Sequence, residues 1–417
     1  MEQKDIFQTY ESEVRSYCRS FPSVFTRAKG SVITDTDGRE YIDFFCGAGA
    51  VNYGHNNDYI KEKLISYLEN DGIIHALDMM TDSKAEFIQY FEEAVLQPRG
   101  LDYKIMFTGP TGTNGVEAAL KLARKVKKRE NIWCLMGCFH GMTLASLALT
   151  SDKDSRQGAG VPLNYVTHIP APYMFEGLDT IKYMETMLTD DHSGVDKPAA
   201  LIIETVQAEG GVHVLSSEWL QAVRKFCTDY DILLIVDDIQ VGCARTGTFF
   251  SFERAGIVPD MVVMSKSIGG YGLPFAVTLF KPEYDIWTPG EHNGTFRGNQ
   301  LAMIAAKAGL EYMLEHEIEK EAARKETIIR DYLKHNVAGE NAVVRGIGCI
   351  FGIDVGSGER AKAITKACFE NGLIIERAGR DNSVVKLMPA LTIPDELLIK
   401  GMDIIKNAIK EVLKTNI

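Results

Sequence analysis

The chain has 417 residues, of which 45% are hydrophobic and 24% are charged, and its formal net charge is -12. This length exceeds the size at which a single hydrophobic core usually stops growing, so we expect two packed domains. The acidic balance disfavours nucleic acid and anionic membranes as partners, because both reward clustered Lys and Arg. The first twenty residues lack the apolar core of a secretory signal, and no apolar run is long enough to span a bilayer. We therefore expect a cytoplasmic protein without nucleic-acid or membrane partners.

The eight cysteines are scattered along the chain. They form no CxxC pair and no Cys/His cluster at the spacing of a zinc site. We therefore expect reduced thiols and no bound metal.

Short apolar runs alternate with helical patterns through most of the chain. Residues 31–45 predict two short strands joined by a tight turn at Asp37-Gly38. From about residue 60 to 330, strand candidates are separated by amphipathic helices, which is typical of a parallel sheet covered on both faces. The strand candidates are KIMFT, NIWCLMG, AALIIET, ILLIVDD and DMVVMSK, and the helical segments include VEAALKLARKVKK and residues 217–230. The sequence thus predicts an α/β domain.

The pattern changes after a helix that begins near Asn299. Two helical patterns there flank short strands such as CIFGIDV and VVKLMPA. This mixed tail predicts a smaller α+β domain, which the N-terminal strands join. We expect an N-terminal segment of the small domain at 1–60, a large domain at 61–305 and a C-terminal small domain at 306–417.

In an open α/β sheet, ligands collect at the carboxyl ends of the strands, so the residues after each strand indicate the chemistry. The first such end, MFTGPTGTNG, opens a helix with Gly112, Thr113 and Asn114. Backbone N–H groups at a helix N-terminus, with Thr hydroxyls beside them, form an anion site. A plain N-cap with a turn explains the same residues.

Two further strand ends carry charged side chains. The strand ILLIVDD ends in Asp237 and Asp238, and a carboxylate there can keep a ring nitrogen protonated. The strand DMVVMSK ends in Lys266, followed by a Gly-rich turn. A desolvated lysine amine becomes a nucleophile. Taken singly, each residue is also explained as a loop cap or a solvated side chain.

The order of these segments resembles the class III aminotransferases of fold type I, which include the ornithine, acetylornithine, 4-aminobutyrate and diaminobutyrate transaminases. The resemblance covers nearly the whole chain. It rests on the ordered run of the Gly/Thr-rich loop, FHG at 139–141, ETVQAEGG at 204–211, DDIQVGCARTG at 237–247, SKSIGG at 265–270 and Thr295. The resemblance implies pyridoxal 5'-phosphate as cofactor and a type I fold, with a large domain around a mixed, mostly parallel sheet.

The resemblance also implies residue roles. Lys266 would bind the cofactor as a Schiff base and carry the proton, and Asp237 would pair with the pyridinium nitrogen. Thr295 would be a phosphate ligand donated by a partner subunit, which implies a homodimer or higher homo-oligomer with shared active sites. The further cofactor-binding residues implied are Gly112, Thr113, Asn114, Phe139, His140, Glu204 and Gln240.

The substrate side departs from the family pattern. Glu209 matches a carboxylate that masks an arginine in ω-amino members, but Lys386 stands where that arginine is usual. Met142 replaces an arginine that often grips a distal carboxylate. A lysine does not reproduce the bidentate fork of an arginine, so the carboxylate anchor is expected to differ. Arg377 and Arg345 are the alternative cations.

Within the family, the N-terminal segments ESEVRSYCRSFPSVFTRAKGS and DFFCGAGAVNYGHNN are most similar to the diaminobutyrate transaminases of ectoine biosynthesis. This resemblance implies amino transfer from L-glutamate to L-aspartate 4-semialdehyde, giving L-2,4-diaminobutyrate and 2-oxoglutarate. Residues 49–53, with Val51 and Tyr53 among them, would line the substrate side. A turn after a strand explains the same segment.

Other functions remain open from the sequence. Another ω-amino acid transaminase shares the motifs, and so do decarboxylases, racemases and aminomutases of the same fold, since these also use Lys266 and Asp237. A nucleotide-binding oxidoreductase or a noncatalytic binding protein is disfavoured, because the Gly-rich loop has neither a GxGxxG run nor a Walker lysine.

Overall fold

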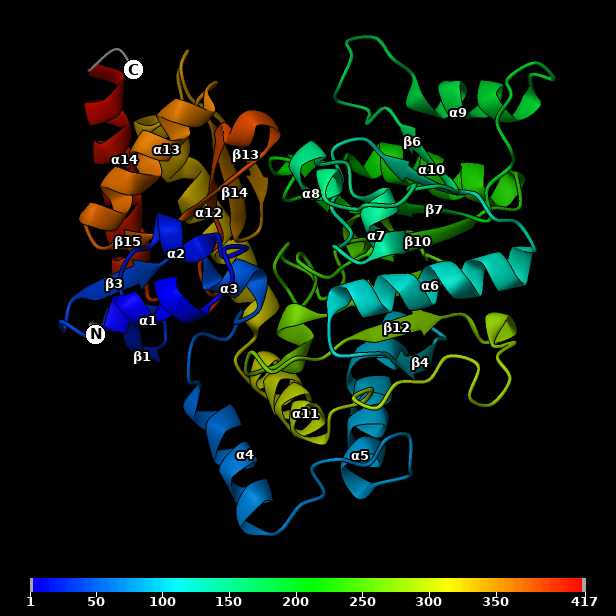
Figure 1. Ribbon diagram of the computed structural model, residues 1–417, viewed down its shortest axis with the longest axis horizontal. Helices are drawn as coiled ribbons and strands as arrows, with labels where there is room; N and C mark the ends of the chain where they lie inside the picture. The colour runs from blue at the N-terminus through cyan, green and yellow to red at the C-terminus, as the bar shows by residue number, and fades with distance from the viewer. Residues whose placement is uncertain (1–2, 415–417) are drawn as a thin grey trace.

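The computed structural model describes residues 3–414 and is built around a seven-stranded sheet (Figure 1). Most neighbouring strands are parallel, and β12 alone runs antiparallel to both of its neighbours, β11 and β4. The predicted mixed, mostly parallel sheet is therefore confirmed. In spatial order the strands are β4 (Lys104–Phe107), β12 (Val277–Phe280), β11 (Met261–Met264), β10 (Leu233–Asp237), β7 (Ala200–Ile203), β5 (Ile132–Leu135) and β6 (Val166–Ile169).

Helices cover both faces of this sheet because successive side chains of each strand point to opposite sides. In β10, Ile235 packs in a cluster with the apolar stripe of α6 (Gly112–Lys127). Its neighbour Val236 packs in a second cluster with α10 (Ser217–Asp229). Each fully buried aliphatic side chain contributes roughly 1.5–3 kcal/mol to folding. The continuous apolar runs of the sequence are therefore explained by burial on both faces.

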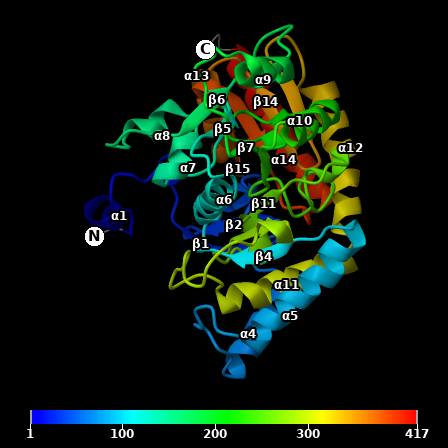
Figure 2. The ribbon, with the colours of Figure 1, turned by 90° about the vertical axis from the view of Figure 1, so that its right-hand side faces the viewer.

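Helix α11 (Gln300–Glu315) packs against two other helices at one edge of the molecule. It contacts α4 (Asp58–Glu69) and α5 (Asp82–Phe91), and Figure 2 shows α11 and α5 side by side. The side chain of Asn299 accepts a hydrogen bond from the N–H of Ala302 and caps α11, so the expected helix start is confirmed. The remaining helices between 140 and 190 are α7 (Leu144–Leu149), α8 (Lys153–Gln157) and α9 (Thr180–Thr189).

Segments from both ends of the chain share one sheet. Strand β15, near residue 373, pairs in parallel with β3, near residue 42. The predicted hairpin over 31–45 is confirmed, with Gly38 at a φ of 82° in its turn. The sheet consists of β1 (Phe25–Lys29), β2 (Val32–Asp35), β3 (Glu40–Asp43) and β15 (Leu373–Ile374), and the short helices nearby are α1 (Gln3–Tyr10), α2 (Tyr17–Ser20) and α3 (Cys46–Gly49).

A second, antiparallel sheet is formed by C-terminal residues, and Figure 1 places these elements beside the N-terminal ones. The expected division at residues 60 and 305 stays a prediction. The C-terminal elements are β13 (Val343–Ile347), β14 (Ile350–Asp354), β17 (Val384–Leu387), β16 (Glu376–Ala378), α12 (Ile318–Asn336), α13 (Gly358–Glu370) and α14 (Asp395–Lys414). A two-stranded ribbon of β8 (Val206–Gln207) and β9 (His213–Val214) completes the strands.

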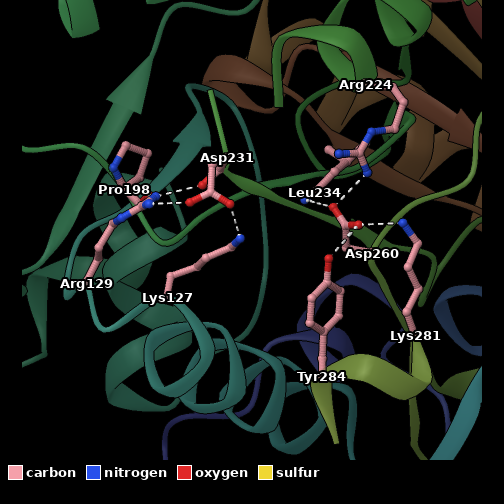
Figure 3. A network of polar contacts seen from close by, with 9 residues as sticks. All are labelled: Lys127, Arg129, Pro198, Arg224, Asp231, Leu234, Asp260, Lys281 and Tyr284. Atoms are coloured by element: carbon pink, nitrogen blue, oxygen red, sulfur yellow. Dashed lines mark hydrogen bonds and ion pairs between the residues drawn. The ribbon is translucent and has the colours of Figure 1, made fainter. Parts of the chain in front are cut away.

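The amino ends of two sheet strands are fixed by carboxylates (Figure 3). Asp260, directly before β11, accepts hydrogen bonds from Arg224 and Lys281 at 2.7 Å and from the N–H of Leu234 at 2.8 Å. Its side chain is buried, so these partners compensate its desolvation. In the same way Asp231, before β10, binds Lys127 and Arg129. This end of the sheet is occupied by structural ion pairs.

No helix within residues 3–414 is long and apolar enough to cross a membrane. All eight cysteines are free thiols, as expected.

Candidate active site

Lys266 and Asp237 meet at the carboxyl edge of the central sheet. Strands β10 and β11 are parallel neighbours, and Asp237, the last residue of β10, lies opposite Val263. Lys266 begins a 3-10 helix, η4 (Lys266–Gly269), shortly after β11 ends. Two residues predicted from separate strands are thus placed at the same edge of the sheet.

Lys266 has an unusual backbone conformation. Its φ is 54°, a left-handed value that costs a non-glycine residue free energy and is concentrated at functional sites. The Nζ atom donates a hydrogen bond to the carbonyl oxygen of Ala48 at 2.8 Å. Removal of the ammonium from bulk water lowers the pKa of Lys266 below its usual value, although the nearby Glu209 carboxylate opposes this shift. A lowered pKa favours the neutral amine, which is the nucleophilic form.

Asp237 is buried and held in one orientation. Its Oδ2 lies 2.7 Å from Nδ1 of His140, and its Oδ1 accepts a hydrogen bond from the N–H of Ile239. His140 is fully buried, and its Nε2 has no partner within the described part of the chain. His140 therefore contacts Asp237 directly and orients its carboxylate.

The residues after β5 and β7 are linked to each other. The N–H of Phe139 donates a hydrogen bond to Oε1 of Glu204 at 2.9 Å. Burial raises the pKa of Glu204 to about 8. Glu204 thus fixes the backbone that carries the ring of Phe139, which is partly buried.

Gln240 links the loop after β10 to the N-terminal segment. Its Nε2 donates hydrogen bonds to the carbonyl oxygen of Ala48 and to Oε1 of Glu209, at 3.0 and 3.1 Å. Its Oε1 is buried and has no partner among residues 3–414. Buried polar atoms are normally satisfied, so this acceptor indicates a missing donor.

The first turn of α6 has features of both interpretations that the sequence left open. The Oδ1 of Asn114 accepts hydrogen bonds from the N–H and the hydroxyl of Thr111, so Asn114 forms a capping box with the N-cap residue Thr111. Thr113 instead points to Thr143 and Ser146. A Cβ on Gly112 would lie 2.8 Å from Ile239, so the backbone is packed closely there. The N-terminal N–H groups of this 16-residue helix provide a site for an anion.

Three charged residues meet where the substrate side was predicted around Glu209 and Lys386. Nζ of Lys386 lies 2.6 Å from Oε1 of Glu209 and 2.9 Å from Oε1 of Glu376, although the second contact lacks hydrogen-bond geometry. The side chain of Lys386 is fully buried. The two carboxylates outweigh the effect of burial and raise the pKa of Lys386, so it stays charged.

The two carboxylates around Lys386 differ in pKa. Burial alone would raise the pKa of Glu209, but the charges of Lys386 and Lys266 lower it to about 2. Burial raises the pKa of Glu376 to about 7. Glu376 was missed from the sequence because nothing local indicates its pairing with Lys386, whereas the strand register places the two side by side.

Glu209 and Glu376 line a cavity of about 1420 Å³, whereas Lys386, Lys266 and Asp237 are not among its lining residues. Its wall also includes Phe139 and Met142. Among the lining residues that the sequence did not single out are Tyr17, Arg19, Arg380 and Glu376. Tyr17 follows no strand and belongs to no motif, so no sequence signal indicated it.

Other predicted residues do not meet in this cavity. Val51 and Tyr53 are 8% and 3% exposed, and Tyr53 packs against Tyr312 in the core. Thr295 lies on an exposed loop before α11. Neither Val51 nor Tyr53 lines the cavity, and their substrate role stays a prediction.

A buried arginine ties the N-terminal segment to Lys266. Arg245 is fully buried, and it donates hydrogen bonds to Oδ1 of Asn52 at 2.5 Å and to the carbonyl oxygen of Cys349 at 3.0 Å. The N–H of Asn52 donates to the hydroxyl of Ser267 at 3.2 Å. This chain of contacts reaches the residue after Lys266, so it holds the 3-10 turn in place.

These groups fit pyridoxal phosphate. An amine and a carboxylate stand at adjacent strand ends, a helix N-terminus offers N–H groups for a phosphate, and an unpaired amide oxygen of Gln240 lies beside them. Lys266, Asp237 and the first turn of α6 could hold its aldehyde, ring nitrogen and phosphate.

Comparison with known proteins identifies the class. The family model of class III aminotransferases matches residues 15–409, and the chain belongs to this family, whose cofactor is pyridoxal 5'-phosphate. The chain is 53% identical to a diaminobutyrate–2-oxoglutarate transaminase of Sporosarcina pasteurii, over 98% of this chain and 97% of that protein. It is 51% identical to the protein of the same name from Streptomyces coelicolor, with 97% of each chain covered.

The fold is also found among solved structures. The ornithine aminotransferase of Toxoplasma gondii superposes with a TM-score of 0.87 at 24% identity, covering 100% of this chain and 97% of that chain. The predicted type I fold is therefore confirmed.

Proposed function

We propose that this enzyme transfers the amino group of L-glutamate to L-aspartate 4-semialdehyde, giving L-2,4-diaminobutyrate and 2-oxoglutarate. The observation that supports this proposal most strongly is the near-complete, 53% identical match to a protein named for diaminobutyrate and 2-oxoglutarate. A place in ectoine biosynthesis and a cytoplasmic location stay predictions.

Bound pyridoxal phosphate would supply an electron-accepting ring and a carbonyl that reacts with amines. Lys266 would hold this carbonyl and move a proton to and from the substrate carbon, as the lowered pKa of its amine favours. Asp237, oriented by His140, would keep the ring nitrogen protonated. The ring of Phe139 would stack on the cofactor, and the amide of Gln240 would face its oxygen.

The phosphate of the cofactor would bind at the first turn of α6. Gly112 and Thr113 would contribute backbone N–H groups and a hydroxyl there. Asn114 supports this turn as a cap, and Glu204 supports the backbone of Phe139 from below.

The substrate side would be built on Glu209 and Lys386. Since Glu209 neutralises Lys386 in this structure, an incoming carboxylate would compete with Glu209 for the ammonium. The exposed third of the Glu209 side chain leaves it room to move. Glu376 would keep Lys386 in place during this exchange.

We also infer a homodimer or higher homo-oligomer with shared active sites. Thr295 is exposed and makes no hydrogen bond or ion pair within residues 3–414, as expected if it serves another subunit. The neighbouring Phe296 is 66% exposed and Met80 is 97% exposed, which is unusual for large apolar side chains without a partner surface.

Mixed dimers test this sharing. Subunits carrying Lys266→Ala and subunits carrying Thr295→Ala are each expected to have impaired sites. In a mixed dimer one site would receive both substitutions and the other would receive neither, so activity should recover on mixing. A mixture no more active than the sum of its parts would contradict shared sites.

A donor and acceptor panel tests the reaction. We expect 2-oxoglutarate formation from L-glutamate with aspartate semialdehyde, and much less with glutamate semialdehyde or succinate semialdehyde. Preference for either of these aldehydes would favour an ornithine or 4-aminobutyrate type of transaminase. Release of CO2 or racemised product without 2-oxoglutarate would instead indicate a decarboxylase, racemase or other non-transaminating enzyme.

A further inference from the structure

A transaminase that takes L-glutamate must hold a substrate with two carboxylates, yet the cations expected to do so are engaged. Lys386 is buried between Glu209 and Glu376. Arg345 lies 3.2 Å from the carboxylate of Asp354, and its Nε donates to a backbone carbonyl. One alternative from the sequence is thereby committed elsewhere.

Met142 leaves one wall of the cavity without the charge that family members place there. Its side chain is 55% exposed and lines the cavity together with Phe139. A thioether cannot bind a carboxylate, so a second anchor has to come from another element.

Arg380 brings a guanidinium to this same cavity. It follows Gly379, whose N–H donates to the carbonyl oxygen of Glu209 at 2.8 Å, so its backbone is attached to the substrate side. A Cβ on Gly137, two residues before Phe139, would lie only 3.2 Å from Nη2 of Arg380. The guanidinium therefore lies against the turn that leads into Phe139.

The surroundings of Arg380 hold it without neutralising it. Its Cζ lies 5.9 Å from the centre of the Tyr173 ring, a cation–π contact. The hydroxyl of Tyr173 donates to Gln207 at 2.5 Å, which fixes the ring. No carboxylate lies within ion-pair distance of Arg380 among residues 3–414. An arginine with an aromatic brace and no acidic partner is suited to binding an anionic ligand.

Arg377 lines the same cavity, but it lies on the opposite face of its strand from Glu376. In β16, Glu376 lies opposite Lys386 and pairs with it. Successive side chains of a strand point to opposite faces, so Arg377 is directed away from Lys386.

We propose that Arg380 binds the distal carboxylate of the substrate, the one that L-glutamate and 2-oxoglutarate carry and L-2,4-diaminobutyrate lacks. It supplies the cation that is absent at Met142, with Tyr173 as its brace. This inference rests on the proposed function, because it names the anchor for the substrate of that reaction.

The test compares Arg380→Ala with wild type on two ligands. The KM for L-glutamate and the Kd of glutarate, an unreactive dicarboxylate measured by calorimetry on the holoenzyme, should both rise roughly 10- to 100-fold. The rate at which L-2,4-diaminobutyrate bleaches the bound cofactor should change by less than about threefold. Arg380→Lys should recover part of the affinity, since it restores charge without the fork.

Lys362→Ala serves as the control, because it removes an exposed cation from the same cavity wall. It should leave the Kd of glutarate near the wild-type value. The inference is overturned if Arg380→Ala binds glutarate as tightly as wild type, or if Arg377→Ala raises the Kd of glutarate more than Arg380→Ala does. It is also overturned if Arg380→Ala impairs the reactions with L-glutamate and L-2,4-diaminobutyrate equally.

The proposed function can fail separately. If wild type releases no 2-oxoglutarate from L-glutamate, the proposed reaction is wrong whatever Arg380 does. If wild type turns over L-glutamate and glutarate binding does not depend on Arg380, only the anchor assignment is wrong.

Discussion

Buried carboxylates at the two ends of the central sheet have different partners. At the amino end, Asp260 is surrounded by Arg224, Lys281 and a backbone N–H (Figure 3). At the carboxyl end, the described residues give Asp237 one histidine and one N–H as partners, and they give Glu204 a single N–H. Buried carboxylates that are paired with cations stabilise the fold. Buried carboxylates whose oxygens can still accept hydrogen bonds are able to interact with a ligand.

The same contrast appears in the pKa values. Burial alone would raise the pKa of Asp260, but Arg224 and Lys281 outweigh it and lower the pKa. The pKa of Glu204 is raised to about 8, because burial is not offset by a paired cation. The carboxyl end of the sheet thus carries an electrostatic cost that the amino end does not, as is usual where a site is prepared for a ligand.

The largest effect is expected at the carboxyl end, from Lys266→Ala. In the proposed mechanism, loss of the amine would remove both the bond to the cofactor and the proton carrier, so kcat should fall by roughly 10²- to 10⁴-fold or more. Steady-state kinetics would measure this fall. Lys225→Ala is the control, since Lys225 is exposed and, within residues 3–414, forms an ion pair only with Asp229 on its own helix. Equal losses in both variants would contradict the contrast between a functional and a structural lysine.

Unfolding measured over a pH series tests in which direction Glu204 makes stability change with pH. Its folded pKa of about 8 lies above the usual carboxyl value, so the folded protein binds more protons and stability falls as pH rises from about 5 to 8. Glu204→Gln should remove part of this decline, on the order of 1 kcal/mol per pH unit. Urea unfolding at several pH values would measure it. An unchanged decline in the variant would show that Glu204 does not contribute to the pH dependence and would contradict its raised pKa.

At the amino end, Asp260→Asn should affect stability and spare catalysis. Removing one partner from a fully buried pair costs about 3–5 kcal/mol, and because both cations are partly exposed we expect roughly 2–3 kcal/mol. The loss should grow from low to neutral pH, because Asp260 stabilises the fold only when ionised. The unfolding midpoint and kcat, measured together, check it. A lower kcat with an unchanged unfolding midpoint would contradict a purely structural role for Asp260 at the amino end of the sheet.

The smallest effect concerns the start of α6. Asn114→Ala removes the acceptor for two donors of Thr111 and should cost about 1 kcal/mol in the cofactor-free protein. Thermal unfolding without cofactor would detect the shift. An unchanged melting temperature would mean that the cap contributes nothing at this position.

Much of the cofactor end could be predicted because its information is local. Asp237 ends one apolar strand and Lys266 follows shortly after another, and parallel strands bring their carboxyl ends to one edge, so two short segments sufficed. Strand β12 was not predicted, since its AVTLF run follows a Gly-rich loop and nothing local shows that it inserts antiparallel between β11 and β4.

The substrate side could be predicted only in part, because its geometry depends on segments far apart in sequence. The pair of Glu209 and Lys386 was expected from the resemblance, but the second carboxylate on Lys386 follows from the register of β16 and β17. The surroundings of Arg380 could not be predicted, because its neighbours Tyr173 and Gly137 come from segments far away in the sequence.

The most direct test of the central claim is a single-turnover reaction of the yellow holoenzyme with L-glutamate. If Lys266 and Asp237 form a transaminase site, the visible colour of the cofactor should bleach, one 2-oxoglutarate should be released per site, and aspartate semialdehyde should restore the colour. A colour that persists with L-glutamate, or bleaching that survives unchanged in Lys266→Ala, would contradict the account.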